Sequence, residues 1–400
     1  MNVTRREFLT AVSIAAATRS FAAELAVPAG ALALKRAVAF LWSKQHDDGS
    51  WRSEVYGMMR TGQALTPFVL DALLAVPAAI AERSTGGVER GLQFLRDHAG
   101  QDGCLGRDDP DVLEYPVYST SYALKCLAKA GDDDDEPLAA RMLDYLVAAQ
   151  YAEQHGFTPT APEYGGWGFD KPPGQGRAAH MDLAHTRHAL EGLAAATRRW
   201  PRFADATRTA RDRAQDFLRV VQKDPQAKAP QRLSLAESIA NAVPAPPAPP
   251  FDGGFYLSPR VLEANKGGLA ATPTPHWRSY ATATCDGVLA LLAAGVLHSD
   301  ERVTAAAAWL QRHDDVDSPQ GIPRDDPEPW GDAVRFYHYA VRGEAYRALD
   351  FPRQDRVRLA TAVAARQRDD GSFKNLVGPL MKEDDPLVAT TLAVAGLVAC

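Results

Sequence analysis

The stretch KRAVAFLWSKQHDDGSW, Lys35–Trp51, has a near copy of its last seven residues close to the other end of the chain, QRDDGSF at Gln367–Phe373. Written as a pattern, it is Arg-Ala, two residues, Phe-Leu, three residues, Gln, three residues and Gly-Ser-Trp. One such motif is easily a chance occurrence, but two copies in matched positions indicate an internal repeat. A repeat of this kind determines the architecture of the whole chain.

Weaker copies of the pattern occur between these two. They lie at 90–105, 141–150, 213–222 and 305–314, and the closing copy spans 358–373. The residues at the glutamine position are Gln45, Ala99, Gln150, Gln222, Asp314 and Gln367. The sequence therefore predicts six units with insertions of unequal length between them.

Each copy predicts a helix followed by a tight turn. The Arg-x-x-x-aromatic-Leu part has apolar residues at helical spacing, so we expect a helix that ends near the Gln. The Gly that follows permits a left-handed backbone, which stops the helix and reverses the chain. The Trp or Phe then packs back over the turn, and the Gln side chain can reach carbonyls that the helix end leaves without partners.

A second helix, rich in small residues, follows each turn. These segments are 65–76, 118–131, 181–196, 279–295, 336–349 and 385–399. Ala, Ser, Thr and Gly at their starts let helices crowd together. Six such hairpins predict an all-α fold, a closed (α/α)6 toroid with six inner helices around a central cavity and six outer helices. An open superhelical solenoid is the alternative, but its repeats have more uniform lengths, which favours closure.

The chain is expected to form a single toroid domain, residues 23–400, with two long insertions. The first, 151–180, is rich in Gly, Pro and aromatic residues, and the second, 223–253, contains PAPPAPP before the segment FDGGFYLSP. Pro-rich segments are stiff, and long insertions in a compact fold often serve as lids or binding loops. Both join the first helix of a hairpin to its second, so we expect both at one mouth of the ring.

Residues 1–22 resemble a twin-arginine export signal. Arg5 and Arg6 precede a short apolar run, and Ser20-Phe21-Ala22 offers small residues at the positions that a signal peptidase needs. The run is too short and too interrupted to span a bilayer. We expect export of the folded protein to the periplasm or another extracytoplasmic space; the alternative is a chance Arg-Arg pair.

The composition is that of an ordinary soluble globular protein, with 46% hydrophobic and 24% charged residues. The formal net charge of -6 offers no basic field for nucleic acid or an anionic membrane surface. Among the four cysteines, Cys104 and Cys126 could pair in an oxidising compartment, although buried free thiols are favoured. The sequence does not indicate an oligomeric state.

These repeats resemble the QW (Gln-Trp) motifs of the squalene–hopene cyclase and oxidosqualene cyclase superfamily, whose relatives include the protein prenyltransferase β subunits. YGGWGFD, DGGFYLSP and DDPLVATTLAVAGL are similar to its inter-helix loops and inner helices, and the resemblance covers residues 30–400. It implies an isoprenoid or another apolar ligand in the central cavity, and isomerase or transferase chemistry if the protein is an enzyme. The cyclase acid motif Asp-x-Asp-Asp is missing, because DDDDE at 132–136 lies in a connection between units.

The prenyltransferase comparison also suggests a metal. DLAHTRHALEGL, 182–193, is similar to that family's zinc-histidine helix, and Asp182 and His185 are three residues apart on one helix face. However, the match falls in the third unit rather than the fifth, and no Asp-x-Cys precedes it. We therefore expect no cofactor, with zinc at Asp182 and His185 as the alternative.

The inner helices carry a few ionisable residues at the level of the cavity. Buried there, such groups would have perturbed pKa values, as catalytic acids need, and aromatic faces could stabilise a carbocation. The candidate catalytic residues are Asp182, His185, His188, Asp286 and His338, and the candidate ligand-binding residues are Trp167, Tyr280, Tyr337, Arg187 and Tyr118. The alternative is a pairing of the Arg187–Asp286 or Arg342–Glu344 type that only satisfies the interior.

Three functions remain open at this point. The first is an exported enzyme or binding protein for an isoprenoid or another apolar ligand. The second is a carbohydrate-active toroid, for which Asp325, Asp326, Glu328 and Trp330 in RDDPEPW are the nearest candidates. The third is a non-catalytic interaction scaffold, which the missing acid motif favours.

Overall fold

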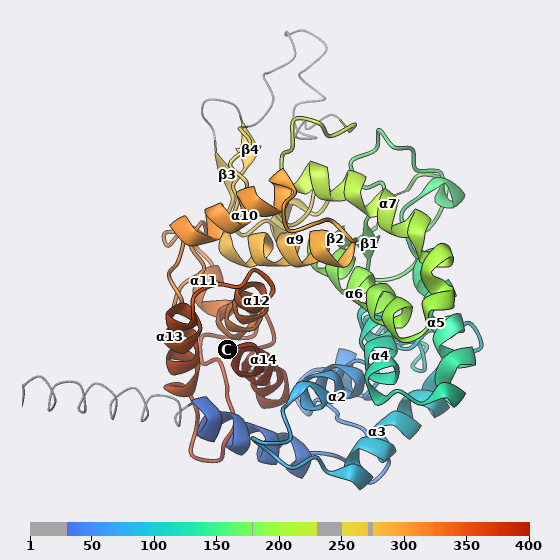
Figure 1. Ribbon diagram of the computed structural model, residues 1–400, viewed down its shortest axis with the longest axis vertical. Coiled ribbons are helices and arrows are strands. Elements are labelled where there is room, and N and C mark those ends of the chain that lie inside the picture. The colour runs from blue at the N-terminus through green and yellow to red at the C-terminus, as the bar shows by residue number, and fades with distance from the viewer. Residues whose placement is uncertain (1–29, 178, 230–249, 271–274) are drawn as a thin grey trace, which may run out of the picture.

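The computed structural model describes residues 30–177, 179–229, 250–270 and 275–400, and in it the helices form a closed ring (Figure 1). Within these ranges the inner wall consists of α2 (Leu65–Ala75), α4 (Pro116–Ala130), α6 (Leu183–Arg199), α9 (Ala281–Ala293), α12 (Arg335–Ala348) and α14 (Pro386–Ala399). Each of these helices packs against the next, and α14 packs against α2. The predicted all-α toroid is confirmed, and the open solenoid is excluded.

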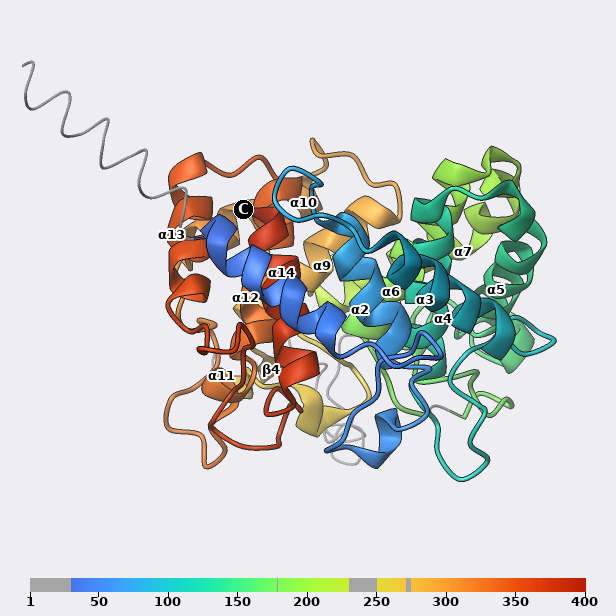
Figure 2. The same ribbon diagram turned by 90° about the horizontal axis from the view of Figure 1, so that it is seen from below.

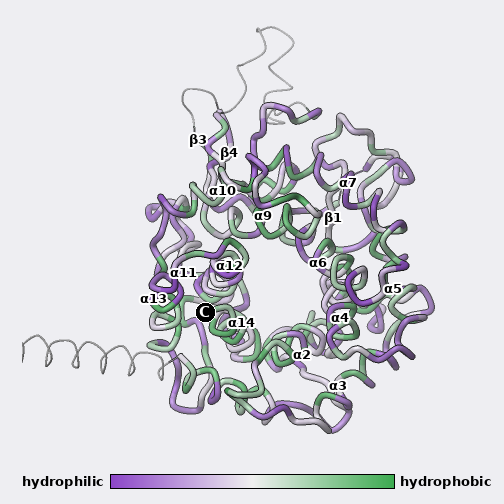
Figure 3. The backbone as a smooth tube through the Cα atoms, in the orientation of Figure 1, coloured by the Kyte–Doolittle hydropathy of each residue, from purple (hydrophilic) through white to green (hydrophobic). Residues whose placement is uncertain are grey.

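The outer layer alternates with the inner one along the chain. It comprises a helix at residues 30–43, α3 (Thr85–His98), α5 (Glu136–Ala148), α7 (Ala204–Val221), α10 (Glu301–Arg312) and α13 (Arg353–Ala364). Outer helices α5 and α7 alternate between hydrophilic and hydrophobic residues (Figure 3), because one face is buried and the other meets solvent. Inner helix α14 contains no charged residue, and α2 and α9 contain one each, Asp71 and Asp286.

Short elements fill the connections. The 3-10 turns are η1 (Gly57–Met59), η2 (Asp133–Asp135), η3 (Glu153–His155), η4 (Pro201–Phe203) and η6 (Leu262–Ala264), and α11 (Trp330–Ala333) is a single helical turn. Strand β1 (Trp167–Gly168) pairs antiparallel with β2 (Met181–Asp182), so that Trp167 faces Asp182 across the pair. Strand β3 (Leu269–Ala270) pairs in the same way with β4 (His276–Trp277).

Glycines set the close approach of α12 and α14. A Cβ atom at Gly343 would lie 2.9 Å from the carbonyl oxygen of Gly396, and one at Gly396 would lie 3.0 Å from that of Tyr339. Both distances are shorter than side chains accept without movement, so the two backbones can approach this closely only because neither position carries a side chain. The small residues of the inner helices therefore set the radius of the ring.

The glutamines of the repeated pattern connect neighbouring hairpins. The Nε2 atom of Gln150 donates to Gly165 O in its own turn (2.9 Å) and to Ala210 O in the next outer helix (2.8 Å). Gln367 does the same with Gly371 O (3.0 Å) and Ala33 O (2.7 Å). Because Ala33 lies in the first outer helix, the last copy of the pattern closes the outer layer of the ring.

Trp167 is the motif aromatic of the third unit. Its Nε1 donates to Leu146 O at 2.7 Å and its backbone N–H to Thr186 Oγ1 at 3.0 Å. Trp51 makes the same two bonds in the first unit. In the third unit the first insertion separates the Gln from its Gly-x-Trp. For this reason the sequence pattern, which has fixed spacing, did not identify Trp167 as the equivalent of Trp51. The structure therefore assigns Trp167 to the packing of a turn.

The connections that lead into the inner helices gather on one face of the ring. In Figure 2, α11 and β4 lie toward one edge, whereas the C-terminus lies toward the other. The described parts of both insertions run from α5 to α6 and from α7 to α9, so they lie on the face where the inner helices begin. Residues 1–22 and part of the second insertion lie outside the described residues.

Two further expectations concern the cysteines and the membrane. All four cysteines lie in the described part of the chain, and each is a free thiol, so Cys104 and Cys126 are not paired. Among the described residues, every helix is too short or too polar to cross a bilayer.

Replacing Gln150 by methionine should destabilise the fold. Gln150 is fully buried, and the change leaves the carbonyls of Gly165 and Ala210 without their donor. The Ala210 carbonyl lies inside α7 and keeps its helical partner, so one buried carbonyl, that of Gly165, is left unpaired. An unpaired buried group costs about 1–3 kcal/mol, and we expect the free energy of unfolding to fall by about that amount. Urea unfolding measures this, with Gln154→Met on the exposed side of the same turn as the control, expected within about 0.5 kcal/mol of the native protein. Equal stability of the two variants would contradict the role of the amide.

Candidate functional site inside the ring

An aromatic cavity lies at the face where the inner helices begin. Its volume is about 250 Å³, and we call it the aromatic chamber. It is lined by Met59, Ala64, Leu65, Phe68, Tyr115, Tyr118, Tyr122, His188, Tyr337, Leu380, Met381, Lys382, Glu383, Val388 and Leu392. Tyr118 and Tyr337, two of the predicted ligand-binding residues, are therefore in its wall.

A larger cavity lies toward the C-terminal ends of the inner helices. Its volume is about 700 Å³, and its wall combines small apolar residues with nine charged ones. We call it the charged chamber; its charged residues are Asp71, Lys125, Lys129, Arg187, Glu191, Arg198, Arg199, Glu344 and Arg347. Phe68 and Tyr122 line both chambers and pack together with ring centroids 5.2 Å apart. This aromatic pair therefore forms part of the partition.

Alternating charges cross the ring below that partition. Lys129 Nζ lies 2.7 Å from one oxygen of Asp71, and Lys125 Nζ lies 3.2 Å from the other. Lys125 also pairs with Glu191 at 3.1 Å. Burial alone would raise the pKa of Asp71, but the two lysines lower it below its usual value. The partners come from α2, α4 and α6, so the charges join three neighbouring inner helices.

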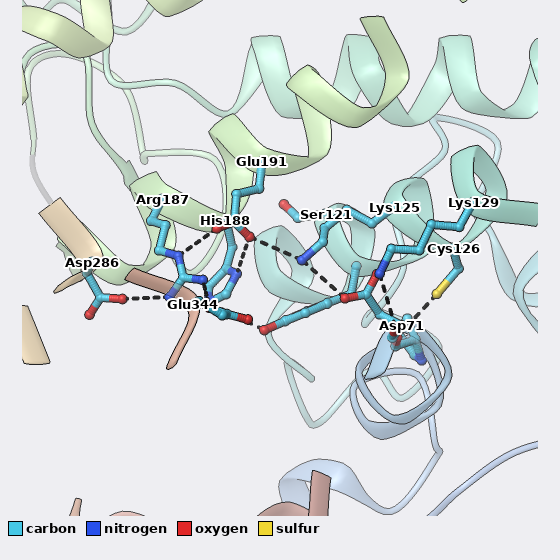
Figure 4. Close-up of polar contacts among 12 residues, drawn as sticks. Asp71, Ser121, Lys125, Cys126, Lys129, Arg187, His188, Glu191, Asp286 and Glu344 are labelled. Carbon is cyan, nitrogen blue, oxygen red and sulfur yellow. Dashed lines mark hydrogen bonds and ion pairs between the residues drawn. The ribbon is translucent and has the colours of Figure 1, made fainter. Parts of the chain in front are cut away.

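Arg187 continues the chain of charges to α9 and α12. It lies between Asp286 and Glu191 (Figure 4), at 3.0 Å from Asp286 Oδ1 and 2.7 Å from Glu191 Oε1, and it also pairs with Glu344. Its side chain is 2% exposed. A buried guanidinium must be paired, and these three carboxylates satisfy it. The predicted Arg187–Asp286 pair is therefore present, as one part of a longer network.

Asp286 is the carboxyl in this network with a raised pKa. Burial raises it to about 6, while Arg187 and the Tyr337 hydroxyl, 2.9 Å from both carboxylate oxygens, limit the rise. The network has three cations, Lys125, Lys129 and Arg187, and four carboxyl groups. One proton on the most buried carboxyl balances these charges, which agrees with the direction of the shift.

A second cluster, on β2 and the first turn of α6, contains His180, Asp182 and His185. Asp182 Oδ1 accepts from the backbone N and from Nδ1 of His185, each at 2.9 Å, and Oδ2 accepts from His180 Nε2 at 3.0 Å. Burial would raise the pKa of Asp182, but His185 and His180 bring it well below its usual range. Asp182 is therefore ionised, caps α6, and fixes the orientation of the His185 ring.

These three residues are the right kind for a transition metal but are not arranged as a zinc site. Their potential ligand atoms lie within 4.8 Å of one another, whereas tetrahedral zinc ligands are about 3.4 Å apart at bond lengths of about 2.1 Å. Both carboxylate oxygens of Asp182 already accept N–H groups. The cluster is that of a hydrogen-bonded carboxylate and two histidines, so no reaction step is assigned to zinc.

The two remaining candidate histidines have different surroundings. His188 lines the aromatic chamber, with Nε2 at 3.4 Å from Tyr122 Oη, and burial lowers its pKa to about 4. His338 is fully buried, and its Nε2 lies 3.2 Å from Asp315 O, in the loop between α10 and α11. His338 lines neither chamber. The structure thus brings His188 to the cavity and leaves His338 in the packing between α12 and that loop.

The predicted ligand-binding residues also divide into two groups. Tyr118 and Tyr337 line the aromatic chamber and Arg187 lines the charged chamber. Trp167 and Tyr280 are buried and line neither. Tyr280 Oη instead meets the backbone of Lys266, a residue that the sequence analysis did not select.

Several site residues were not foreseen. Lys125 and Glu191 stand among small residues in α4 and α6, which is the signal that could have identified them, whereas Glu344 was expected to pair with Arg342 and instead pairs with Arg187. Lys266 lies 5.3 Å from the ring centre of Trp330, and burial lowers its pKa, although Asp182 and Asp286 oppose that shift. Lys266 therefore lies in the electrostatic field of both carboxylates.

The acidic run at 132–136 takes no part in the site. Asp133 pairs with Arg199, and Asp135 pairs with Arg96 at 2.8 Å. Neither lines a chamber, which agrees with the expectation that this run is not the cyclase acid.

Comparison with known proteins establishes the fold. No protein-family model matches the sequence, and no curated protein does. Among solved structures, a variant of the type II terpene cyclase MstE from Scytonema, bound to merosterolic acid A, matches with a TM-score of 0.54 and 15% identity, over 94% of this chain and 98% of the cyclase. Another variant of that cyclase, bound to geranylgeranyl dihydroxybenzoate, matches with 0.53 and 14%, over the same shares.

A glycoside hydrolase has nearly the same similarity. The GH76A alpha-1,6-mannanase from Salegentibacter sp. HEL1_6 matches with a TM-score of 0.52 and 9% identity, over 93% of this chain and 100% of the mannanase. At these identities the likeness shows the fold alone, because one fold serves many functions. The chain therefore has the α/α toroid fold that the cyclase and the mannanase share.

Asp286→Asn should change the dependence of stability on pH. The native state keeps the Asp286 proton up to about pH 6, whereas the unfolded chain releases it near pH 4. The stability that this proton contributes is therefore present below pH 4 and is lost as the pH rises through 6, a change of about 3 kcal/mol.

Asparagine does not titrate, so the variant should lack this decline. Urea unfolding of both proteins from pH 4 to 7 tests this, because groups common to both, such as Glu383, cancel in the difference. Parallel pH profiles would show that Asp286 is ionised throughout.

Proposed function

We propose that this protein binds an isoprenoid or another apolar ligand inside its ring, with the aromatic chamber as the site. The observation that carries the proposal is the lining of that chamber, where Tyr115, Tyr118, Tyr122 and Tyr337 are joined by leucine and methionine side chains. Apolar walls with a few polar groups are typical of small-molecule sites. The geranylgeranyl dihydroxybenzoate bound to the cyclase neighbour supports such a ligand by analogy of fold.

Asp286 is the residue that we propose for acid chemistry on this ligand. Tyr337, which lines the chamber, donates its hydroxyl to the Asp286 carboxyl, and the raised pKa of that carboxyl keeps part of it protonated close to neutral pH. Asp286 itself lines neither chamber, so its proton would reach an alkene or an epoxide through Tyr337, whose hydroxyl gives its own proton to the ligand as it takes that of Asp286. The tyrosine faces then stabilise the resulting cation, so isomerase chemistry of the cyclase type follows.

The carbohydrate and scaffold alternatives have less support. Asp325, Asp326 and Glu328 lie on the loop before α11 and line neither chamber. They form no opposed pair across a groove of the kind that a glycosidase needs. A scaffold would need neither an aromatic chamber nor a buried carboxyl with a raised pKa.

Binding of geraniol tests the proposed site. In isothermal titration, we expect saturable binding of one geraniol per chain, and Leu380→Asp should weaken it at least tenfold. Leu380 is a partly exposed residue in the wall of the aromatic chamber, so the new carboxylate would be desolvated by an apolar ligand. Leu376→Asp is the matched control, since Leu376 is 85% exposed on the same loop and lines no chamber.

The outcomes separate the alternatives. Equal weakening by both variants, or no geraniol binding by the native protein, would reject the aromatic chamber as an isoprenoid site. Binding of mannotriose in place of geraniol would favour the carbohydrate-active reading.

We also propose that the protein is exported through the twin-arginine route. The support is the Arg5-Arg6 pair with its short apolar run. Replacing both arginines by lysine should leave the full-length protein in the cytoplasm, while the native chain appears outside it and starts near Ala23. Cell fractionation with N-terminal mass analysis tests this, and unchanged export of the double variant would refute it.

A further inference from the structure

One buried acceptor near the aromatic chamber has no partner in the described residues. His185 Nε2 is buried and makes no hydrogen bond. Buried polar atoms in native proteins are nearly always paired, so an orphan of this kind needs an explanation, such as an absent ligand. The other ring nitrogen, Nδ1, donates to Asp182 Oδ1 at 2.9 Å.

The bond to Asp182 decides what Nε2 can do. An ionised carboxylate only accepts hydrogen bonds, so Nδ1 carries a proton toward Asp182. In the tautomer whose single proton is on Nδ1, Nε2 has a lone pair and accepts. The carboxylate is itself held in place, because it caps α6 and also accepts from His180. The acceptor is therefore fixed in both tautomer and direction.

His185 packs against Tyr118, a residue of the chamber wall, and is not itself among the lining residues. His185 and His188 are three residues apart on one face of α6, and His188 lines the aromatic chamber. The His185 ring lies among aromatic rings, with centroids at 4.2 Å from Tyr118 and 4.9 Å from Phe169. Tyr118 is itself in the chamber wall, and the His185 side chain is 5% exposed.

We propose that the apolar ligand carries a hydroxyl group, and that this hydroxyl donates a hydrogen bond to His185 Nε2. The inference rests on the proposed function, because it names the polar group of the ligand in the aromatic chamber. Phe169 offers no acceptor to compete for that hydroxyl, and the ring of Tyr118 provides the apolar surroundings in which such a bond is strong. An apolar ligand without a donor would leave Nε2 unpaired and buried, which costs about 1–3 kcal/mol.

The experiment compares geraniol with geranyl methyl ether, which has the same chain but cannot donate. Isothermal titration of the native protein should show at least tenfold tighter binding of geraniol. In His185→Phe the two probes should bind with equal affinity, because the aromatic ring is kept while the acceptor is lost. His298→Phe is the matched control, since His298 is exposed and bonds only to Ala348 O. It should keep the tenfold preference.

A measurement on the native protein guards against misfolding of the variant. In ¹⁵N NMR, His185 Nε2 should have the shift of an unprotonated imidazole nitrogen, and geraniol should move that shift while the ether should not. Equal affinity of the native protein for both probes would overturn this inference and leave the proposed site intact, whereas failure of both to bind would reject the site itself. One equivalent of zinc in the native protein that is lost in His185→Phe would also overturn it.

Discussion

A buried glutamine amide that bridges two carbonyls is the contact on which the ring depends. Gln222 shows the same geometry as Gln150 and Gln367, donating to Gly253 O in its turn (3.1 Å) and to Arg302 O in the next outer helix (2.8 Å). Both amide hydrogens are used, so glutamate, which lacks donors, cannot replace it, and asparagine is one methylene shorter. At Asp314 the polarity is reversed, because Arg358 of the next outer helix donates to it at 2.9 Å. Each of these contacts joins only two neighbouring hairpins, and the ring closes because such contacts recur along the chain.

The architecture was predictable because every helix has its own short-range signal. Apolar spacing, a terminating glycine and small residues place α2, α4 and their counterparts close to the predicted bounds. The misassignment of Trp167 has a physical reason. Tyr151 N donates to Gly166 O and Gly165 N donates to Tyr151 O, at 3.0 and 2.7 Å, so the chain leaves the turn and returns to it. A pattern with fixed spacing cannot detect a motif whose two halves are joined only by such backbone bonds.

The site was less predictable, because its partners come from helices that are distant in sequence. Asp71 and Asp286 stand out as single charges in apolar helices, and the level of the inner helices indicates Arg187 as a partner of Asp286, but nothing near Asp71 in the chain indicates Lys125. Their pairing requires the ring to be closed, and closure also decides the charge balance. Three cations among four carboxyl groups leave one proton to be held, and the most buried carboxyl holds it. Local sequence therefore identifies candidates, while the protonation state is a property of the assembled ring.

Two buried carboxylates, Asp182 and Asp286, have opposite pKa shifts because their donors differ. Asp182 accepts three N–H groups, from His180 and His185, and stays ionised. Asp286 accepts from Arg187 and Tyr337 but also lies in the field of Glu344, and it retains a proton. Paired titratable groups with separated pKa values are how proteins assign acid and acceptor roles at one pH. Here the separation leaves a proton at Asp286, while the carboxylate of Asp182 orients the His185 ring, whose Nε2 has no hydrogen-bond partner among the described residues.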